Sequence, residues 1–388
     1  MKDEAAALRI ETLAVHGGEP RPAAQGSVVF PIYQGTVFTD PPGTAYDDLQ
    51  YIRLNSTPSQ VYLHNKLAAL EGAEAAIATS SGMAALTTTL LALMKPGDHI
   101  LAGDCLYGGS HAFLAKNAER LGWTYTLVDA QEPDAWDAAI RPETRVFLCE
   151  TMTNPLLRVP ALDAIVSLCR ERGVLSLIDN TFASPASFRP LDHGFDLSFH
   201  SATKYLNGHS DVVAGCVMGS RALIDDVRHA LNLYGASLDP HAGFLLARGI
   251  KTLALRVRAS TANALALARA LAAHPRVLQV NYPGLETHPD HLRAARLLSG
   301  FGGMLSFRIG GDEATAGAFV DRLRLAYVAP SLGGVETLVT LPVRTSHASI
   351  PRAEREAVGI TDDLVRVSSG IEASDCLLAD FAQALEKD

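Results

Sequence analysis

The chain of 388 residues is long enough to form two or three domains around a large hydrophobic core. Hydrophobic residues make up 48% of it and charged residues 19%, a composition that is typical of a globular enzyme and excludes a disordered chain. The net charge of −9 argues against nucleic acid or a membrane surface as a partner, and no apolar run approaches the roughly 20 residues of a membrane-spanning helix.

The first 50 residues predict an arm rather than a domain. Gly and Pro recur in HGGEPRPAAQGSVVFPIYQGTVFTDPPGT with little periodicity. Irregular segments of this length are uncommon in compact proteins unless something supports them, so we expect residues 1–50 to lie on a neighbouring subunit. The charged start, MKDE, is not followed by the apolar stretch of a secretory signal, and we therefore expect a cytoplasmic location.

Residues 51–248 alternate between apolar strand-like runs and amphipathic helical runs. Strands are expected in HILAGD, TYTLVDA, TRVFLCE, VLSLIDN and DLSFHSA, and a helix in ALDAIVSLCRERG, ending at Gly173. Strands that are apolar on both faces and separated by helices predict a parallel sheet covered on both sides. Ligands of such sheets bind beyond the carboxyl ends of the strands.

Residues 249–388 predict a smaller α+β domain. A long helical region spans about residues 243–274, after which the strands become fewer and shorter, as in GMLSFRIGG, ETLVTLP and LVRVSSG. They alternate with helices expected in ATAGAFVDRLR and ASDCLLADFAQALEKD. The fold class is therefore α/β, with a large parallel-rich sheet domain and a smaller C-terminal α+β domain.

The cysteines and histidines do not indicate a metal site. The five cysteines are scattered, odd in number and form no C-x-x-C pair, and the 13 histidines show no H-E-x-x-H spacing. We expect buried thiols, no disulfide framework and no metal.

Two strand-end residues indicate a cofactor. Asp179 ends LSLID and Lys204 closely follows FDLSF, so both fall where a parallel sheet binds ligands. Taken singly, the aspartate is an ordinary turn cap and the lysine an ordinary surface residue. Together they match the needs of pyridoxal 5′-phosphate (PLP), which a lysine holds as a Schiff base while an acidic group keeps the ring nitrogen protonated.

A phosphate site is expected at a helix start. In TSSGMAALTTTLLALMK, Ser81, Gly82 and Met83 lie between a short strand and a helix, where backbone N–H groups and the helix dipole favour an anion. Ser201 and Thr203, just before the lysine, carry hydroxyls that could bond phosphate oxygens. Each feature alone also has an ordinary explanation, as a helix cap or a local backbone contact.

Aromatic and basic residues complete the predicted site. Tyr107 follows a strand in DCLYGGS and could stack on a pyridine ring, with a half-buried core tyrosine as the alternative. Tyr51 and Arg53 are two residues apart, so in an extended arm they would point the same way, with the guanidinium suited to phosphate. Arg366 is a lone charge on an apolar strand and needs an anionic partner.

Taken in order, these motifs resemble the Cys/Met metabolism family of PLP-dependent enzymes, the trans-sulfuration group of cystathionine γ-synthase, γ-lyase and β-lyase and methionine γ-lyase. The resemblance covers essentially the whole chain and is carried by YIRLNSTPS, SSGMAAL, LYGGS, ETMTNPLLRVP, LIDNTFASP, HSATKYLNGHSDVVAG, RGIKTLALR, SLGGVETL and LVRVSSGIE. It implies the PLP-dependent aminotransferase-like fold, fold type I, in homotetramers made of two catalytic dimers.

The resemblance also implies a role for each candidate residue. Lys204 would form the Schiff base, and Tyr107 would stack on the ring and act near the substrate amine. The cofactor would further contact Tyr51, Arg53, Ser81, Gly82, Met83, Asn154, Asp179, Thr181, Ser201 and Thr203. The substrate would contact Asn154, Ser331 and Arg366, the last two through its α-carboxylate. Tyr51 and Arg53 would come from the neighbouring subunit.

The expected function is PLP-dependent C–S lysis of cystathionine-type sulfur amino acids, by β- or γ-elimination that yields a thiol, a 2-oxo acid and ammonia. The alternative is γ-replacement on an acylated homoserine, as in cystathionine γ-synthase. A PLP-binding protein without turnover is the alternative from another class.

Four positions depart from patterns common in this family. Leu54 and Ala112 stand where γ-synthases that use succinylated homoserine commonly carry arginine. Pro330 replaces a glutamate frequent in γ-synthases and γ-lyases, and Gly109 a cysteine usual in methionine γ-lyases. These departures disfavour a succinyl-ester synthase and a methionine γ-lyase, and they leave the substrate open.

Overall fold

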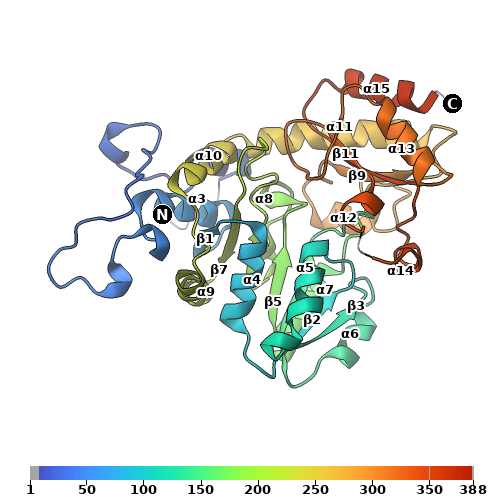
Figure 1. Ribbon diagram of the computed structural model, residues 1–388. Coiled ribbons are helices and arrows are strands. Elements are labelled where there is room, and N and C mark those ends of the chain that lie inside the picture. The colour runs from blue at the N-terminus through green and yellow to red at the C-terminus, as the bar shows by residue number, and fades with distance from the viewer. Residues whose placement is uncertain (1–7, 349, 387–388) are drawn as a thin grey trace.

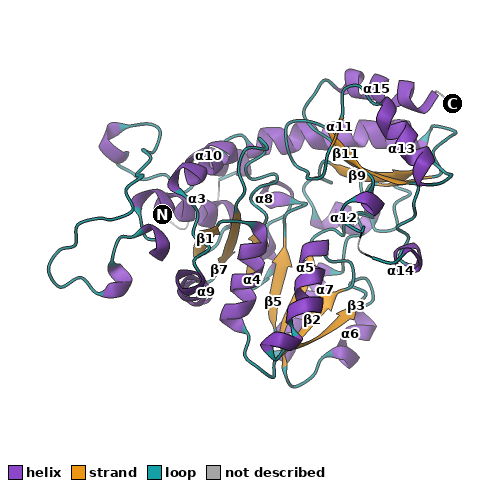
Figure 2. Ribbon diagram, in the orientation of Figure 1, coloured by secondary structure: helices purple, strands orange, loops and turns teal. Residues whose placement is uncertain are grey.

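The computed structural model describes residues 8–348 and 350–386, which form two sheets connected by a long helix (Figures 1 and 2). The first seven residues of the predicted arm and the last two of the predicted C-terminal domain lie outside the described residues. The strands are β1 (Ala75–Thr79), β2 (His99–Gly103), β3 (Thr124–Val128), β4 (Thr144–Glu150), β5 (Leu175–Asp179), β6 (Leu197–His200), β7 (Gly215–Gly219), β8 (Gln279–Asn281), β9 (Met304–Arg308), β10 (Tyr327–Val328), β11 (Leu338–Thr340) and β12 (Leu364–Ser368).

The α-helices are α2 (Ile10–His16), α3 (Pro58–Glu71), α4 (Gly82–Leu93), α5 (Gly108–Asn117), α6 (Pro133–Ala139), α7 (Leu162–Arg172), α8 (Ser184–Ser187), α9 (Arg221–Tyr234), α10 (Pro240–Ile250), α11 (Leu253–Ala272), α12 (His291–Leu297), α13 (Glu313–Arg322), α14 (Arg352–Ala357) and α15 (Ser374–Glu386). Local sequence explains several of their ends. The helix α3 begins with Pro58 behind a Thr57–Gln60 capping box, and α7 ends at Gly173 in the left-handed conformation, as predicted.

The large sheet has the order β1-β7-β6-β5-β4-β2-β3. The pairs among β2 to β6 are parallel, and β7 runs antiparallel to both of its neighbours. All five strands predicted in this region are present, which confirms the parallel-rich α/β architecture. The strand β7 was not predicted, because two of its five residues, Gly215 and Gly219, are glycines, which are unfavourable in strands.

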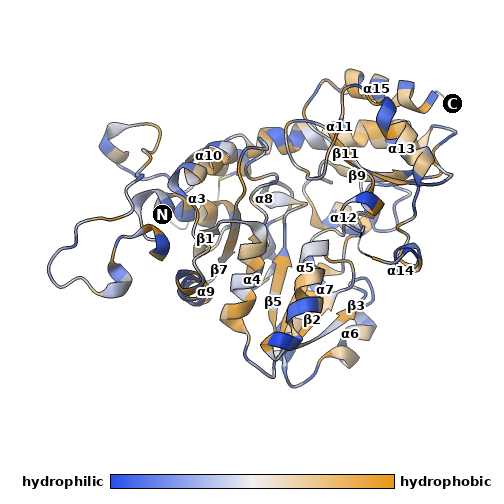
Figure 3. Ribbon diagram, viewed as in Figure 1, coloured by the Kyte–Doolittle hydropathy of each residue, from blue (hydrophilic) through white to orange (hydrophobic). Residues whose placement is uncertain are grey.

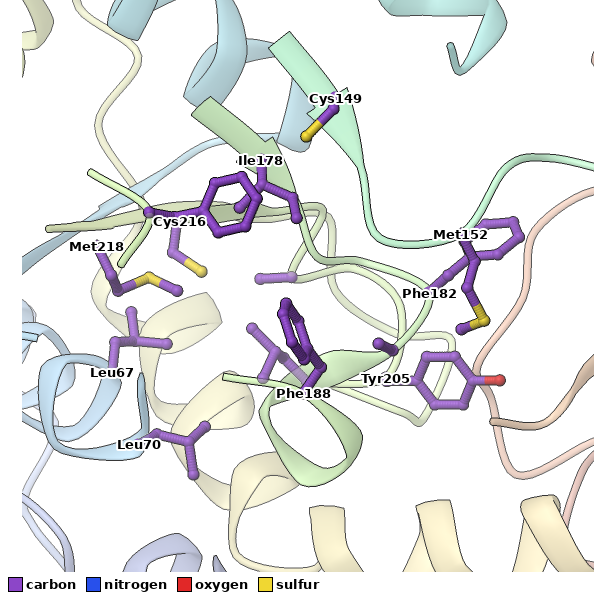
Figure 4. Close-up of a cluster of buried hydrophobic side chains, with 14 of the residues drawn as sticks. Leu67, Leu70, Cys149, Met152, Ile178, Phe182, Phe188, Tyr205, Cys216 and Met218 are labelled. Atoms are coloured by element: carbon purple, nitrogen blue, oxygen red, sulfur yellow. The ribbon is translucent and has the colours of Figure 1, made fainter. Parts of the chain in front are cut away.

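Alternate residues of the strands face two separate hydrophobic clusters. Phe147 and Cys149 join the cluster that includes α3 and α7, whereas Val146 and Leu148 join the cluster that includes α4, α5 and α9. Figure 3 shows β5 in the hydrophobic colour, and Figure 4 shows part of the first cluster. Because helices cover both faces, the polar strand ends lie at the edges of the sheet.

The second sheet, of order β10-β11-β12-β9-β8, packs with α11, α13 and α15 around a third cluster. The predicted strands and helices of this region are present. The helical region predicted over residues 243–274 is two helices, α10 and α11, separated at Lys251 and Thr252. The boundaries at residues 51–248 and 249–388 stay a prediction.

The N-terminal segment is irregular between α2 and α3 and projects from the body of the protein (Figure 1). Its base is fixed by Glu19, whose carboxylate accepts hydrogen bonds from Tyr62 and Lys66 and pairs with Lys251. Further along, Val28 is 90% exposed and Val37 74% exposed. Val29 and Ile32 are exposed as well, so the segment presents several apolar side chains to solvent. Among the described residues, no helix has both the length and the apolar character needed to cross a membrane.

Candidate active site

A cavity of about 630 Å³ opens beyond the carboxyl ends of the large sheet, against residues of the second sheet. Its lining includes most of the predicted site residues, namely Ser81, Gly82, Met83, Tyr107, Asn154, Asp179, Thr181, Ser201, Thr203, Lys204, Ser331 and Arg366. Residues that are up to 285 positions apart in the sequence are thus brought to one place. Tyr51 and Arg53 do not line it.

Lys204 lies in the turn after β6 and presents its amine to the cavity. Its Nζ donates a hydrogen bond to Ser331 Oγ at 2.6 Å. Burial, and secondarily the charge of Arg366, lowers the pKa of Lys204 to about 8. The backbone of Ser331 has φ 102°, a left-handed value that is strained for a residue with a side chain. A lysine in this setting is neutral often enough to act as a nucleophile or a base.

Asp179 ends β5 and is the acidic group that faces the cavity beside the lysine turn. The Oδ1 of Asp179 accepts two hydrogen bonds from Thr181, one from the backbone N–H at 2.9 Å and one from the side-chain hydroxyl at 2.5 Å. The same hydroxyl oxygen accepts from the backbone N–H of Ser201 at 2.8 Å. Burial raises the pKa of Asp179 overall, although the Thr181 hydrogen bonds and, to a smaller extent, a charge on His200 act in the opposite direction. The two hydrogen bonds from Thr181 hold the carboxylate in one orientation at the end of the strand.

The start of α4 forms a close-fitting cradle. Ser81 is the N-cap, and its hydroxyl accepts from the backbone N–H of Ala84 at 3.0 Å. A Cβ at Gly82 would lie 2.7 Å from Ser201 Cβ, so only glycine fits there. The backbone N–H groups of this first turn favour an anion. The hydroxyl of Thr203 lines the cavity but is also bonded to the backbone of Ala214.

Arg366 enters the cavity from β12 and is 5% exposed. Its Nη1 donates to Asn154 Oδ1 at 3.2 Å and its Nη2 to the carbonyl of Ser331 at 3.1 Å. Burial lowers the pKa of Arg366 to about 10. No carboxylate within the described residues forms an ion pair with this guanidinium, and a buried cation in that position is suited to a ligand carboxylate.

Tyr107 is the N-cap residue of α5; it lines the cavity and is 47% exposed. Its position depends on Gly109, where a Cβ would lie 2.5 Å from the ring. The backbone N–H of Tyr107 donates to Glu150 Oε1. Gly109 therefore has a packing role in this chain, because any side chain there would displace the tyrosine.

Glu150 is a cavity residue that the sequence reasoning missed. It ends β4 directly opposite Asp179 in the register of β4 and β5, and it is 7% exposed. Burial raises the pKa of Glu150 well above its usual value, and the nearby Asp179 charge adds to this effect. The signal was present, because the run VFLCE ends in an acid just as LSLID does.

Other parts of the cavity wall had no sequence signal. They come from neutral residues, among them Met152, Phe182, Phe199, Val213, Leu332, Thr345 and Ser346. Of the positions that depart from the family pattern, Pro330 lines the cavity, whereas Leu54 is 4% exposed and belongs to the packed interior.

Tyr51 and Arg53 lie outside the cavity, and the expectation of an extended segment through both is wrong. Ile52–Leu54 is a 3₁₀ turn that Asn55 closes in the left-handed conformation. The guanidinium of Arg53 lies 5.6 Å from the Tyr51 ring centroid and donates to the carbonyl of Asn232 at 2.9 Å. Neither residue reaches the site of its own chain.

These residues fit PLP. The amine of Lys204, the carboxylate of Asp179 and the anion cradle at Gly82 supply the three kinds of contact that the aldehyde, ring nitrogen and phosphate require. No cluster of His, Cys, Asp or Glu within the described ranges could hold a metal ion. An α/β sheet with this site at its carboxyl edge defines a PLP-dependent enzyme of fold type I.

Comparison with known proteins narrows this class. The chain belongs to the Cys/Met metabolism PLP-dependent enzyme family, whose model matches residues 11–386. It is 42% identical to cystathionine γ-lyase of Bacillus subtilis (strain 168), over 98% of this chain and 100% of that protein. It is 41% identical to cystathionine β-lyase of Lactococcus lactis subsp. cremoris (strain MG1363), over 97% of this chain and 99% of that one.

A solved structure extends the comparison to a third activity. Cystathionine γ-synthase of Xanthomonas oryzae pv. oryzae, in complex with aminoacrylate and cysteine, matches with a TM-score of 0.93 and 39% identity, over 98% of each chain. The chain is thus a PLP-dependent enzyme of the cystathionine lyase and synthase type.

Proposed function

We propose that this enzyme is a C–S lyase that acts on cystathionine-type sulfur amino acids and releases a thiol, a 2-oxo acid and ammonia. The observation that carries the proposal is the position of Ser331 between two functional groups. Its hydroxyl accepts from the amine of Lys204, and its carbonyl accepts from the guanidinium of Arg366. A bound α-carboxylate and the base that removes the α-proton therefore lie on either side of one residue.

Each residue has a defined part in the reaction. Arg366 binds the α-carboxylate. Its hydrogen bonds to Asn154 and Ser331 hold the guanidinium in one orientation. The neutral amine of Lys204 takes the proton from Cα, for which a pKa of about 8 is well matched near neutral pH. PLP, when bound, supplies the electron sink that stabilises negative charge at Cα. The same amine returns protons as the C–S bond breaks, and water releases the 2-oxo acid and ammonia.

Tyr51, Arg53 and the N-terminal arm complete the site in an assembly. We propose a homotetramer of two catalytic dimers, in which these two residues reach the cofactor phosphate of the neighbouring subunit. The exposed valines of the arm support this assignment, because a partner surface would bury them. The cytoplasmic location and the division into an arm, a domain of residues 51–248 and a domain of residues 249–388 belong to the same proposal.

A substrate panel tests the proposed reaction. Cystathionine, cysteine, homocysteine, methionine and acylated homoserines are assayed for thiols, 2-oxo acids and new thioethers. Homocysteine with pyruvate indicates β-elimination, and cysteine with 2-oxobutyrate indicates γ-elimination. Either pair supports the lyase. A thioether formed from an acylated homoserine and cysteine, with no 2-oxo acid from cystathionine, contradicts it in favour of γ-replacement. A PLP-bound protein that turns over no member of the panel would be a binder only.

A further inference from the structure

Glu71 is a buried carboxylate in an unfavourable position. It is the last residue of α3, and its side chain is 0% exposed. The C-terminal end of a helix repels an anion, and burial removes the solvation that would offset this repulsion. A carboxylate at such a place needs either a proton or a cation.

The partner of this carboxylate is His200, the last residue of β6. Its Nε2 lies 2.6 Å from Glu71 Oε1, and the imidazole is 1% exposed. The same oxygen also accepts from the hydroxyl of Ser198 at 3.1 Å and from the amide of Asn180 at 3.4 Å. A buried carboxylate oxygen that accepts from a hydroxyl and an amide and lies against an imidazole nitrogen has the geometry of a carboxylate–imidazole ion pair.

The pair lies behind the cofactor site, on the opposite face of the large sheet. Side chains alternate along β6, so Ser198 and His200 face α3 while Phe199, the register partner of Asp179, faces the cavity. Because His200 directly follows Phe199, the imidazole and the Asp179 carboxylate lie on opposite faces of two neighbouring strands, at the same carboxyl edge of the sheet. Burial has the largest effect and raises the pKa of Asp179 overall, and a positive charge on His200 acts in the opposite direction.

In the part of the chain that the structure describes, Cys216 and Arg189 are other ionisable groups on elements packed against this pair. From β7, Cys216 is the register partner of His200, and burial raises the pKa of its thiol well above the usual value, so it stays neutral. Beyond the end of α3, a guanidinium nitrogen of Arg189 lies against Gly72. Figure 4 shows Cys216 with Leu67 and Leu70 of α3 in the hydrophobic cluster on this face of the sheet. Among the described residues, Glu71 and His200 are thus paired behind Asp179, and Arg189 adds a positive charge beyond the end of α3.

We propose that Glu71 and His200 are positioning residues for the cofactor: they keep the imidazole protonated across the sheet from Asp179, so that Asp179 stays ionised and holds the protonated ring nitrogen of PLP. The inference rests on the cofactor site of the proposed function. It adds two residues that act on this site through Asp179. Neither residue touches the cavity.

Three variants separate charge from packing. Glu71→Gln keeps an oxygen that accepts from His200 and removes the negative charge, and His200→Gln removes the imidazole. Ser198→Ala is the matched control, since it deletes a hydrogen bond to Glu71 without changing any charge. Circular dichroism and thermal unfolding of each apoprotein establish that the variants are folded.

Two measurements decide the proposal. Imidazole ¹⁵N shifts of the apoprotein, assigned to His200 by comparison with His200→Gln, report its protonation at pH 8. Titration with PLP reports the Kd. We expect His200 to be charged in the wild type and in Ser198→Ala but neutral in Glu71→Gln. We also expect a Kd about tenfold weaker in Glu71→Gln and His200→Gln, equivalent to about 1.4 kcal/mol, and changed less than about twofold in Ser198→Ala.

A neutral His200 in the wild type, or a Glu71→Gln Kd within about twofold of the wild type, overturns the proposal and leaves the pair a structural contact. Should a variant fail to fold, the wild-type ¹⁵N shifts still decide the protonation state. Failure of the wild type to bind PLP would instead overturn the cofactor site itself, and the ¹⁵N result would stand apart from it.

Discussion

Lys204 is surrounded by groups that favour its neutral form. Burial is the main cause of its lowered pKa, and the Arg366 charge adds to it. The rate at which apoprotein forms the Schiff base with PLP should therefore rise with pH only up to about 8 and then level off. For a lysine with its ordinary pKa of about 10.4, the rise would continue beyond pH 10.

Arg366→Met should move this midpoint upward, because the nearby positive charge is lost while the burial remains. Stopped-flow absorbance measures both profiles, with n-butylamine and PLP in solution as the reference reaction. An unchanged midpoint in Arg366→Met would mean that the two side chains do not interact electrostatically.

Glu150, at the end of β4, fixes the position of Tyr107, because its carboxylate accepts a hydrogen bond from the backbone N–H of Tyr107. Glu150→Gln keeps an acceptor oxygen and should lower kcat/KM by less than about threefold. Glu150→Ala leaves the partly buried N–H of Tyr107 without this partner and frees the residue to move, and should lower kcat/KM by at least tenfold. Equal effects of the two substitutions in steady-state assays would show that the charge of Glu150, rather than its hydrogen bond, is what matters.

At the scale of elements, the start of α4 should be the least tolerant part of the cofactor site. In Gly82→Ala, the new Cβ would meet the Ser201 backbone and side chain at 2.7–2.8 Å, so α4 or the lysine turn must shift. We expect a PLP Kd at least tenfold weaker. Gly103→Ala is the matched control, since its Cβ would lie 3.6 Å from Ala130, an ordinary contact. If both variants bind PLP equally, the helix start does not form the phosphate site.

Element patterns in the sequence predicted most of this fold, for identifiable reasons. Short apolar runs such as VFLC and LSLI indicate buried strands whatever they pair with. The strands β4 and β5 could therefore be located without coordinates. The strand β7 could not, because glycines at both of its ends leave only three side chains to indicate a strand, and its pairing with β1 and β6 is decided by tertiary contacts. For the same reason the sequence did not reveal the partnership of Glu71 with His200, which are 129 positions apart.

The residues of the candidate site fall into the same two groups: those whose position follows from a predicted element, and those whose position depends on tertiary contacts. Residues carried by strand ends and helix starts, such as Asp179 and Gly82, were predicted because their position follows from the element before or after them. The geometry of Arg53 was not predicted, because Ile52–Leu54 forms a 3₁₀ turn instead of the expected extended segment. The neutral wall around Pro330 belongs to loops, whose course depends on what they pack against.

At the scale of the whole molecule, the site requires a second copy if Arg53 acts on the neighbouring cofactor. Lys204→Ala and Arg53→Ala subunits, each poorly active alone, are mixed, unfolded and refolded together. Hybrid dimers should then contain one intact site, with Lys204 from one subunit and Arg53 from the other, and should recover up to about half of the wild-type activity per dimer. No recovery in hybrids whose formation is verified by mass spectrometry would place Arg53 in its own subunit or outside the reaction.

The most direct test of the whole account is chemical. Purified holoenzyme is reduced with borohydride, digested, and its peptides mapped by mass spectrometry. We predict one pyridoxyl group per chain, attached to Nζ of Lys204. The absence of the adduct, or its attachment to another lysine, would contradict the account.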